Sequence, residues 1–114
     1  MQDAWVEPAD VDTYLEAARR DALGLRFNLA FYADPRHFDS QIEHFAESRR
    51  RVDEIASPLL TAQTVEFFAD GVVENETGAL LKPYCSSLHN HDMQIWDGDS
   101  LAEANAVEEV NKIL

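Results

Sequence analysis

The fold class of this chain depends most on one stretch of sequence, LRFNLAFY at residues 25–32. Apolar residues recur at every second position of this stretch, as they do on one face of a β-strand. The side chains on that face are Leu25, Phe27, Leu29 and Phe31. The pattern predicts a strand over residues 25–32. If this stretch and residues 63–69 were helical instead, the protein would be mostly α, which is the alternative fold class.

Helical patterns lie on both sides of this strand. Residues 8–23 begin with proline and carry apolar side chains at three- and four-residue spacing, and the glycine that follows favours the end of a helix. Residues 34–57 begin with Asp-Pro, a helix-start signal, and stop just before another proline. A capping box of Ser100 and Glu103 predicts a last helix that runs to the C-terminus.

The C-terminal half also contains strand signals. Residues 63–84 are rich in β-branched and aromatic residues and contain two turn signals, which predicts two or three short antiparallel strands. A loop at residues 85–92 and a short strand at residues 93–96 should follow. Because a sheet must cover its apolar face, we predict a single α+β domain over residues 1–114. Its helices would pack on one face of a small, mainly antiparallel sheet.

The chain is strongly acidic, with a formal net charge of -13 and an isoelectric point near 4.4. Residues 1–51 hold seven basic and ten acidic residues, a net of -3, whereas residues 52–114 hold two basic and twelve acidic residues, a net of -10. Because phosphate backbones and anionic lipids attract Lys and Arg, we expect no direct binding to nucleic acid or membranes. The same field favours a basic surface on another protein, unless the acidity serves solubility alone.

A few residues bear on localisation. Cys85 is the single cysteine, so no disulfide can form within the chain. The first residues, MQDAW, lack the basic start and apolar stretch of a signal peptide. The sequence has no run of about 18 apolar residues, the length that a membrane span needs. We therefore expect a cytoplasmic protein that does not cross a membrane.

Residue types that bind metals gather in the predicted loop. Thiolate, imidazole and carboxylate groups are ligands for divalent transition metals. The loop contains Cys85, His89, His91 and Asp92. Structural zinc sites usually have paired ligands, whereas this chain has one cysteine and no second pair. The segment is therefore either a polar loop with surface histidines or the centre of a small metal-binding protein or metal-dependent enzyme.

Other enzyme signatures are missing from the sequence. It has no Gly-x-Ser-x-Gly segment, and its four glycines form no phosphate-binding loop. A thiolate pair of Cys85 with His89 or His91 would be a nucleophile, but a lone cysteine is more often a small core residue. The sequence therefore favours a non-enzymatic protein without a cofactor.

The acidic half also suggests an interaction surface, because apolar anchors ringed by polar groups are typical of protein interfaces. The aromatic residues that the pattern does not assign to the core are Trp5, Tyr32, Phe68 and Trp96. The residues predicted to bind a partner are Glu66, Asp70, Glu74, Glu76, Trp96, Asp97, Asp99, Glu103 and Glu108.

Our leading hypothesis is a protein-interaction module or inhibitor that engages a basic surface of a partner protein. In composition the chain resembles DNA-mimic proteins, such as bacteriophage inhibitors of host defence nucleases. That resemblance implies a partner that binds nucleic acid, whose phosphate site the carboxylates would occupy. A homo-oligomer built on the apolar end Ile113-Leu114 is a further hypothesis.

Overall fold

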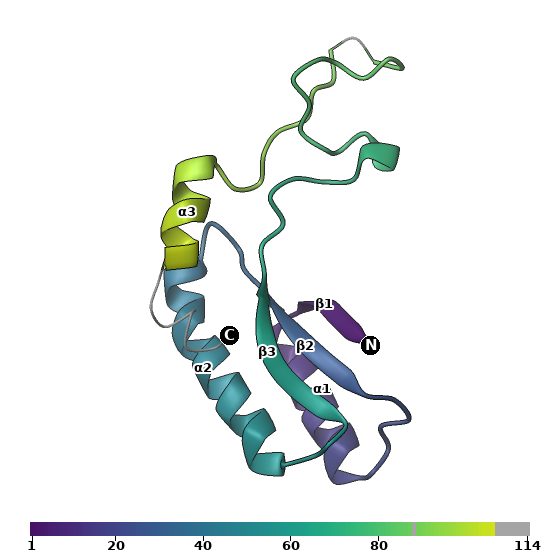
Figure 1. Cartoon of the computed structure of the whole chain (residues 1–114), viewed down its shortest axis with the longest axis vertical. Coiled ribbons are helices and arrows are strands. Elements are labelled where there is room, and N and C mark those ends of the chain that lie inside the picture. Colours follow the sequence, from purple (N-terminus) through teal and green to yellow (C-terminus); the bar gives the residue numbers. More distant parts are fainter. Residues whose placement is uncertain (88, 107–114) are drawn as a thin grey trace.

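The computed structural model describes residues 1–87 and 89–106 (Figure 1). In this part of the chain the strands are β1 (Gln2–Val6), β2 (Phe27–Tyr32) and β3 (Leu60–Glu66). The α-helices are α1 (Pro8–Arg19), α2 (Phe38–Ile55) and α3 (Gly98–Ala106), and a 3₁₀ turn spans Val73–Asn75. Strands and helices alternate as β1-α1-β2-α2-β3, and a long segment then leads to α3.

The three strands form one parallel sheet in the order β1-β2-β3. The prediction of an α+β fold with a mainly antiparallel sheet is therefore wrong, and the architecture is α/β. The physical reason is connectivity. α1 and α2 each carry the chain back along the sheet, so that the next strand starts at the same end as the previous one.

β2 confirms the strand predicted around residues 25–32 and excludes the mostly α alternative. β3 begins before the region predicted as antiparallel strands, residues 63–84, and ends at Glu66. The turn signals beyond it do not join strands. In the described residues they lie in a segment that contains the 3₁₀ turn and an isolated bridge between Tyr84 and Ser87.

Two further local features differ from the sequence predictions. The strand predicted at residues 93–96 is absent, because the amides of Ile95 and Trp96 both donate to the carbonyl of Ala69, at 2.8 and 3.3 Å. β1 was not predicted, since its sequence QDAWV shows no alternation of apolar and polar residues. Its place in the sheet is set by pairing with β2.

The helices predicted on either side of β2 are confirmed as α1 and α2, with shifted ends. α3 confirms a helix in the region of the last predicted one, but the capping box predicted for Ser100 and Glu103 is wrong, because the helix begins at Gly98 and Ser100 lies inside its first turn. The carboxylate of Asp97 accepts hydrogen bonds from the amide and the hydroxyl of Ser100, at 3.0 and 2.5 Å. The rest of that predicted helix, residues 107–114, lies outside the described residues, and so does the proposed oligomer contact at its end.

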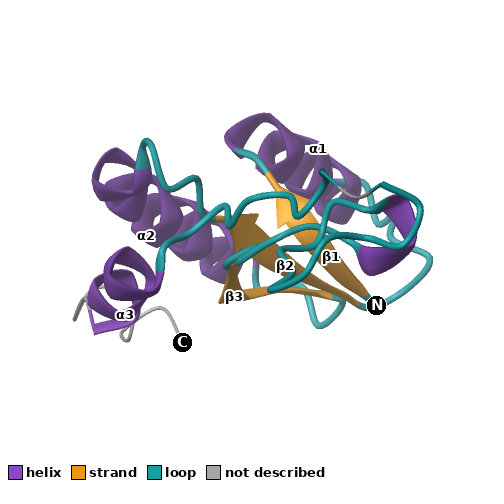
Figure 2. Ribbon diagram, turned by 90° about the horizontal axis from the view of Figure 1, so that it is seen from above, coloured by secondary structure: helices purple, strands orange, loops and turns teal. Residues whose placement is uncertain are grey.

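α1 and α2 lie together on one face of the sheet (Figure 2). Right-handed crossovers explain this arrangement, because both connections step in the same direction across the sheet. The core lies between the layers, where Phe31 stacks on Phe45 and Tyr14 packs on Phe27, each with ring centroids 5.2 Å apart. Among the described residues, no helix is both long and apolar enough to span a membrane.

The opposite face of the sheet has no helix over it in the described part of the chain (Figure 2). Polar side chains occupy its middle, where the Asn28 amide group donates to the Thr64 hydroxyl at 2.8 Å. Gln2 of β1 donates to the Glu66 carboxylate of β3 at 3.4 Å, so this bond passes over β2. All-parallel sheets are usually covered on both faces. We call this surface the uncovered face.

Candidate functional site

A long projection joins β3 to α3, and we call its residues 69–95 the arm (Figure 1). Backbone hydrogen bonds hold its two limbs together: the amide of Ile95 donates to the carbonyl of Ala69 at 2.8 Å, and that of Leu80 to the carbonyl of His91 at 2.9 Å. The radius of gyration is 16.8 Å, whereas a compact domain of ~100 residues has about 13 Å. The arm therefore elongates the molecule.

The arm exposes several large apolar side chains. Leu81 is fully exposed, Met93 is 78% exposed and Val73 is 60% exposed. Further exposed apolar side chains on the arm are Val72, Leu80 and Ile95. Extended apolar surface on a soluble domain usually marks a site of interaction. The arm thus presents several large apolar side chains to solvent.

Three of the carboxylates predicted to bind a partner lie on the arm. Glu74 is exposed on the 3₁₀ turn, whereas Asp70 and Glu76 are half-buried, and each of these two accepts a hydrogen bond within the arm. With Asp92, the arm contains four carboxylates against one basic residue, Lys82. Its polar surface is therefore acidic.

The other predicted carboxylates lie on different elements. Glu66 ends β3 on the uncovered face, and Asp97 holds the first turn of α3. Asp99 and Glu103 are exposed on α3, and Glu108 lies outside the described residues. The structure therefore divides the predicted acidic surface among the arm, α3 and the sheet.

Trp96, which was predicted to contact a partner, is only 4% exposed. Its ring packs against Phe38 and Phe67, with centroids 5.5 and 5.3 Å apart. Its indole N–H donates to the carbonyl of Ala33 at 3.3 Å. Trp96 therefore ties the root of the arm to the carboxyl end of β2 and offers little surface of its own.

The four residues considered as metal ligands also lie on the arm. All of them are exposed: Cys85, His89, His91 and Asp92. Within residues 1–87 and 89–106, no group of three or more His, Cys, Asp or Glu side chains could hold a metal ion. Metal binding by these four residues stays a prediction.

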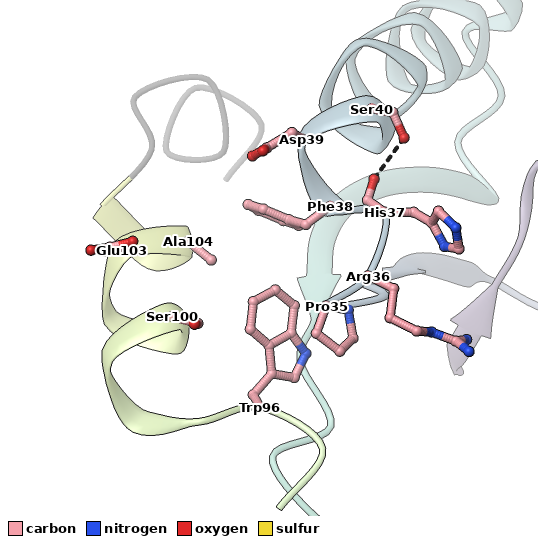
Figure 3. A pocket seen from close by; sticks show the side chains of 10 residues that line it. All are labelled: Pro35, Arg36, His37, Phe38, Asp39, Ser40, Trp96, Ser100, Glu103 and Ala104. Atoms are coloured by element: carbon pink, nitrogen blue, oxygen red, sulfur yellow. Dashed lines mark hydrogen bonds between the residues drawn. The ribbon is translucent and has the colours of Figure 1, made fainter.

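A cavity of about 500 Å³ lies between the first turn of α2 and α3 (Figure 3). Its walls include Trp96, Phe38, Asp39 and Glu103. The hydroxyl of Ser40 donates to the backbone carbonyl of His37 at 2.7 Å. The hydroxyl of Ser100 donates to the carboxylate of Asp97 at 2.5 Å. Both hydroxyls thus stabilise helix starts, and neither bond has the nucleophile-and-base geometry of covalent catalysis.

Asp34 organises the loop between β2 and α2. Its side chain is 13% exposed and accepts hydrogen bonds from the Arg36 guanidinium at 2.9 and 3.0 Å. The Nδ1 atom of His37 lies 3.1 Å from the same carboxylate. The hydrogen bonds from the side chain and amide of Arg36 hold the pKa of Asp34 well below its usual range. The charges of this loop are largely satisfied within it.

Three aromatic side chains meet at the carboxyl end of the uncovered face, and we call Trp5, Tyr32 and Phe68 the aromatic platform. Trp5 stacks on Tyr32 with ring centroids 4.2 Å apart and an interplanar angle of 11°. Phe68 packs 4.9 Å from Trp5 and 5.8 Å from Tyr32. Trp5 is still 51% exposed, and its indole N–H donates to Glu7 at 3.2 Å.

The sequence pattern did not assign these three aromatic residues to the core, and it did not predict that they contact one another. The contact of Trp5 with Tyr32 requires β1 to lie parallel to β2, and β1 was not predicted. The strand-helix-strand order is the signal that would have found it, because the carboxyl ends of parallel strands meet at one edge of a sheet.

Comparison of the chain with protein-family models, with curated proteins and with solved structures finds no match. Its function is therefore inferred from its own residues.

Proposed function

We propose that this chain is a non-enzymatic interaction module that docks its arm on a basic surface of a partner protein. The observation that supports this proposal is the exposure of Leu81, Met93 and Val73 on an arm with four carboxylates. Burial of apolar surface on a partner is favourable by about 25 cal/mol per Å². Carboxylates around the apolar side chains would steer a basic partner toward the arm.

A nucleic-acid-binding protein suits this charge best. Such a protein exposes Lys and Arg to phosphates, and a chain with a net charge of -13 would compete for the same groups. The module would then act as an inhibitor that covers the phosphate site of its partner. A cytoplasmic location, which the single cysteine favours, is part of this proposal.

A photoreactive amino acid in place of Leu81 tests the proposal in an extract of the source cells. We expect one dominant cross-linked product with a basic protein, and a lower yield at high salt because screening weakens charge attraction. The matched control places the same photoreactive residue at Thr13, which is exposed on α1. Equal labelling from both positions would contradict the proposal.

The charge of the arm is tested in the same extract. Glu74→Lys reverses one exposed carboxylate without removing a hydrogen bond that holds the arm together. We expect it to lower the yield from position 81, whereas Glu74→Gln should lower the yield less. An unchanged yield in both variants would show that the carboxylates of the arm play no part in capture.

A further inference from the structure

A β-bulge in β1 sets the direction of Trp5. Asp3 and Val6 pair with residues of β2 that are two positions apart, so Ala4 and Trp5 together lie opposite a single residue. Without the bulge, alternation would place Trp5 on the same face as Asp3, which accepts a hydrogen bond from Tyr14 of α1 at 2.7 Å. The extra residue reverses the alternation. Val6 therefore enters the core, and Trp5 reaches the uncovered face.

The stack on that face is preformed. The rings of Trp5 and Tyr32 are nearly parallel, with centroids 4.2 Å apart, and Phe68 packs against both of them. Trp5 remains 51% exposed to solvent. Rigid aromatic side chains lose little conformational entropy when a ligand binds them. The platform can therefore accept a flat or cationic group with little rearrangement.

Carboxylates border the platform on two sides. Glu7 accepts the indole hydrogen bond of Trp5 at 3.2 Å, and Glu66 is the register neighbour of Tyr32 on β3. Arg36, in the loop that follows Tyr32, already pairs with Asp34 at 2.9 Å. The platform thus combines exposed aromatic surface with negative charge.

We infer that the aromatic platform binds the guanidinium group of an arginine side chain on the partner protein. The face of an indole attracts cations through its quadrupole, and a planar guanidinium stacks on it while its N–H groups reach the carboxylates at the edge. Lysine fits less well because its ammonium group is not planar. This inference rests on the proposed function for its partner, but it concerns the sheet and not the arm.

An NMR titration of the full chain with a Gly-Arg repeat peptide tests this inference. The chain has two indole N–H signals, from Trp5 on the platform and from Trp96, which is buried and bonded to Ala33. We expect the Trp5 signal to shift saturably while the Trp96 signal stays in place. The matched peptide carries citrulline, which is neutral and nearly the same shape, and it should leave Trp5 unmoved. Equal shifts with both peptides would overturn the inference.

Variants that replace a glutamate by glutamine test which carboxylates contribute to binding of the arginine peptide. Glu7→Gln and Glu66→Gln should each weaken binding of the arginine peptide about two- to fivefold, as expected for an exposed cation contact. Glu74→Gln removes the same charge from the arm and should leave the affinity unchanged. If Glu74→Gln weakened binding as much as the platform variants, overall charge and not the platform would attract the peptide.

The two proposals can fail separately, because the peptide titration needs no partner protein. If Trp5 responds to arginine while position 81 captures no partner, the proposed function is wrong and the platform inference stands. If position 81 captures a basic protein while Trp5 does not respond to arginine, the platform inference is wrong and the proposed function stands.

Discussion

The indole N–H of Trp96 donates to the backbone carbonyl of Ala33 at 3.3 Å, across 63 positions of sequence. Ala33 directly follows β2, and Trp96 stands just before α3. Since Trp96 also packs on Phe38 and Phe67, this residue joins the sheet, the first turn of α2 and the return of the arm. Trp96 fixes the arm to the domain at the point where the arm returns, so the position of the arm depends on this residue.

Removing the Trp96 ring should destabilise the protein strongly. We expect Trp96→Ala to lower the free energy of unfolding by about 3–5 kcal/mol, because it leaves a cavity among packed aromatic rings and an unpaired carbonyl. Urea denaturation measures the change. Leu81→Ala, at a fully exposed position on the arm, is the control and should change stability by less than about 0.5 kcal/mol. A similar loss in both variants would contradict the role of Trp96.

The lowered pKa of Asp34 predicts a specific pH dependence of stability. A carboxylate with a depressed pKa in the fold stabilises the protein above its unfolded pKa, about 3.9, and this contribution is lost as the pH falls through the folded pKa. Asp34→Asn should therefore lower the urea midpoint at neutral pH, and its difference from the natural chain should shrink below about pH 4. Asp99→Asn, at an exposed position, is the matched control. A difference for Asp34→Asn that is constant with pH would refute this account.

The hydroxyl of Tyr14 should lose its proton at a higher pH than an ordinary tyrosine does. Burial and the hydrogen bond that its hydroxyl donates to Asp3 raise the pKa of Tyr14 to about 12. Because the folded pKa lies above the unfolded value of about 10, this interaction stabilises the protein fully below that pH and is lost as the pH rises toward 12. A titration that follows tyrosinate absorbance should show one tyrosine that ionises at unusually high pH. Tyr14→Phe should remove this transition, and Asp3→Asn should move it to lower pH. A high-pH transition that survives in Tyr14→Phe would contradict the assignment.

Elemental analysis of the purified protein tests the metal-binding alternative. We expect no stoichiometric zinc, iron or copper, since structural zinc sites usually have paired ligands and this chain has one cysteine and no second pair. A bound metal that is lost in the double variant His89→Ala, His91→Ala would instead support a site on the arm.

The sequence by itself determined the helices and strands whose apolar residues recur at a regular spacing. Alternating apolar residues in LRFNLAFY specified β2, and three- and four-residue spacing specified α1 and α2. It did not determine the direction of pairing. Turn signals in residues 70–78 suggested hairpins. Among the described residues, however, β3 pairs with β2 alone and in parallel, because α2 returns the chain to the end of the sheet where β2 begins.

Tertiary structure alone decided which side chains face outward. Trp96 looked like a surface anchor in the sequence but is buried, whereas Trp5 is half-exposed because a bulge in β1 reverses the side-chain alternation. The exposure of Leu81 likewise depends on the arm projecting from the sheet. The reason is physical: residue spacing encodes which face of an element is apolar, but the packing of elements that are distant in sequence decides what covers that face.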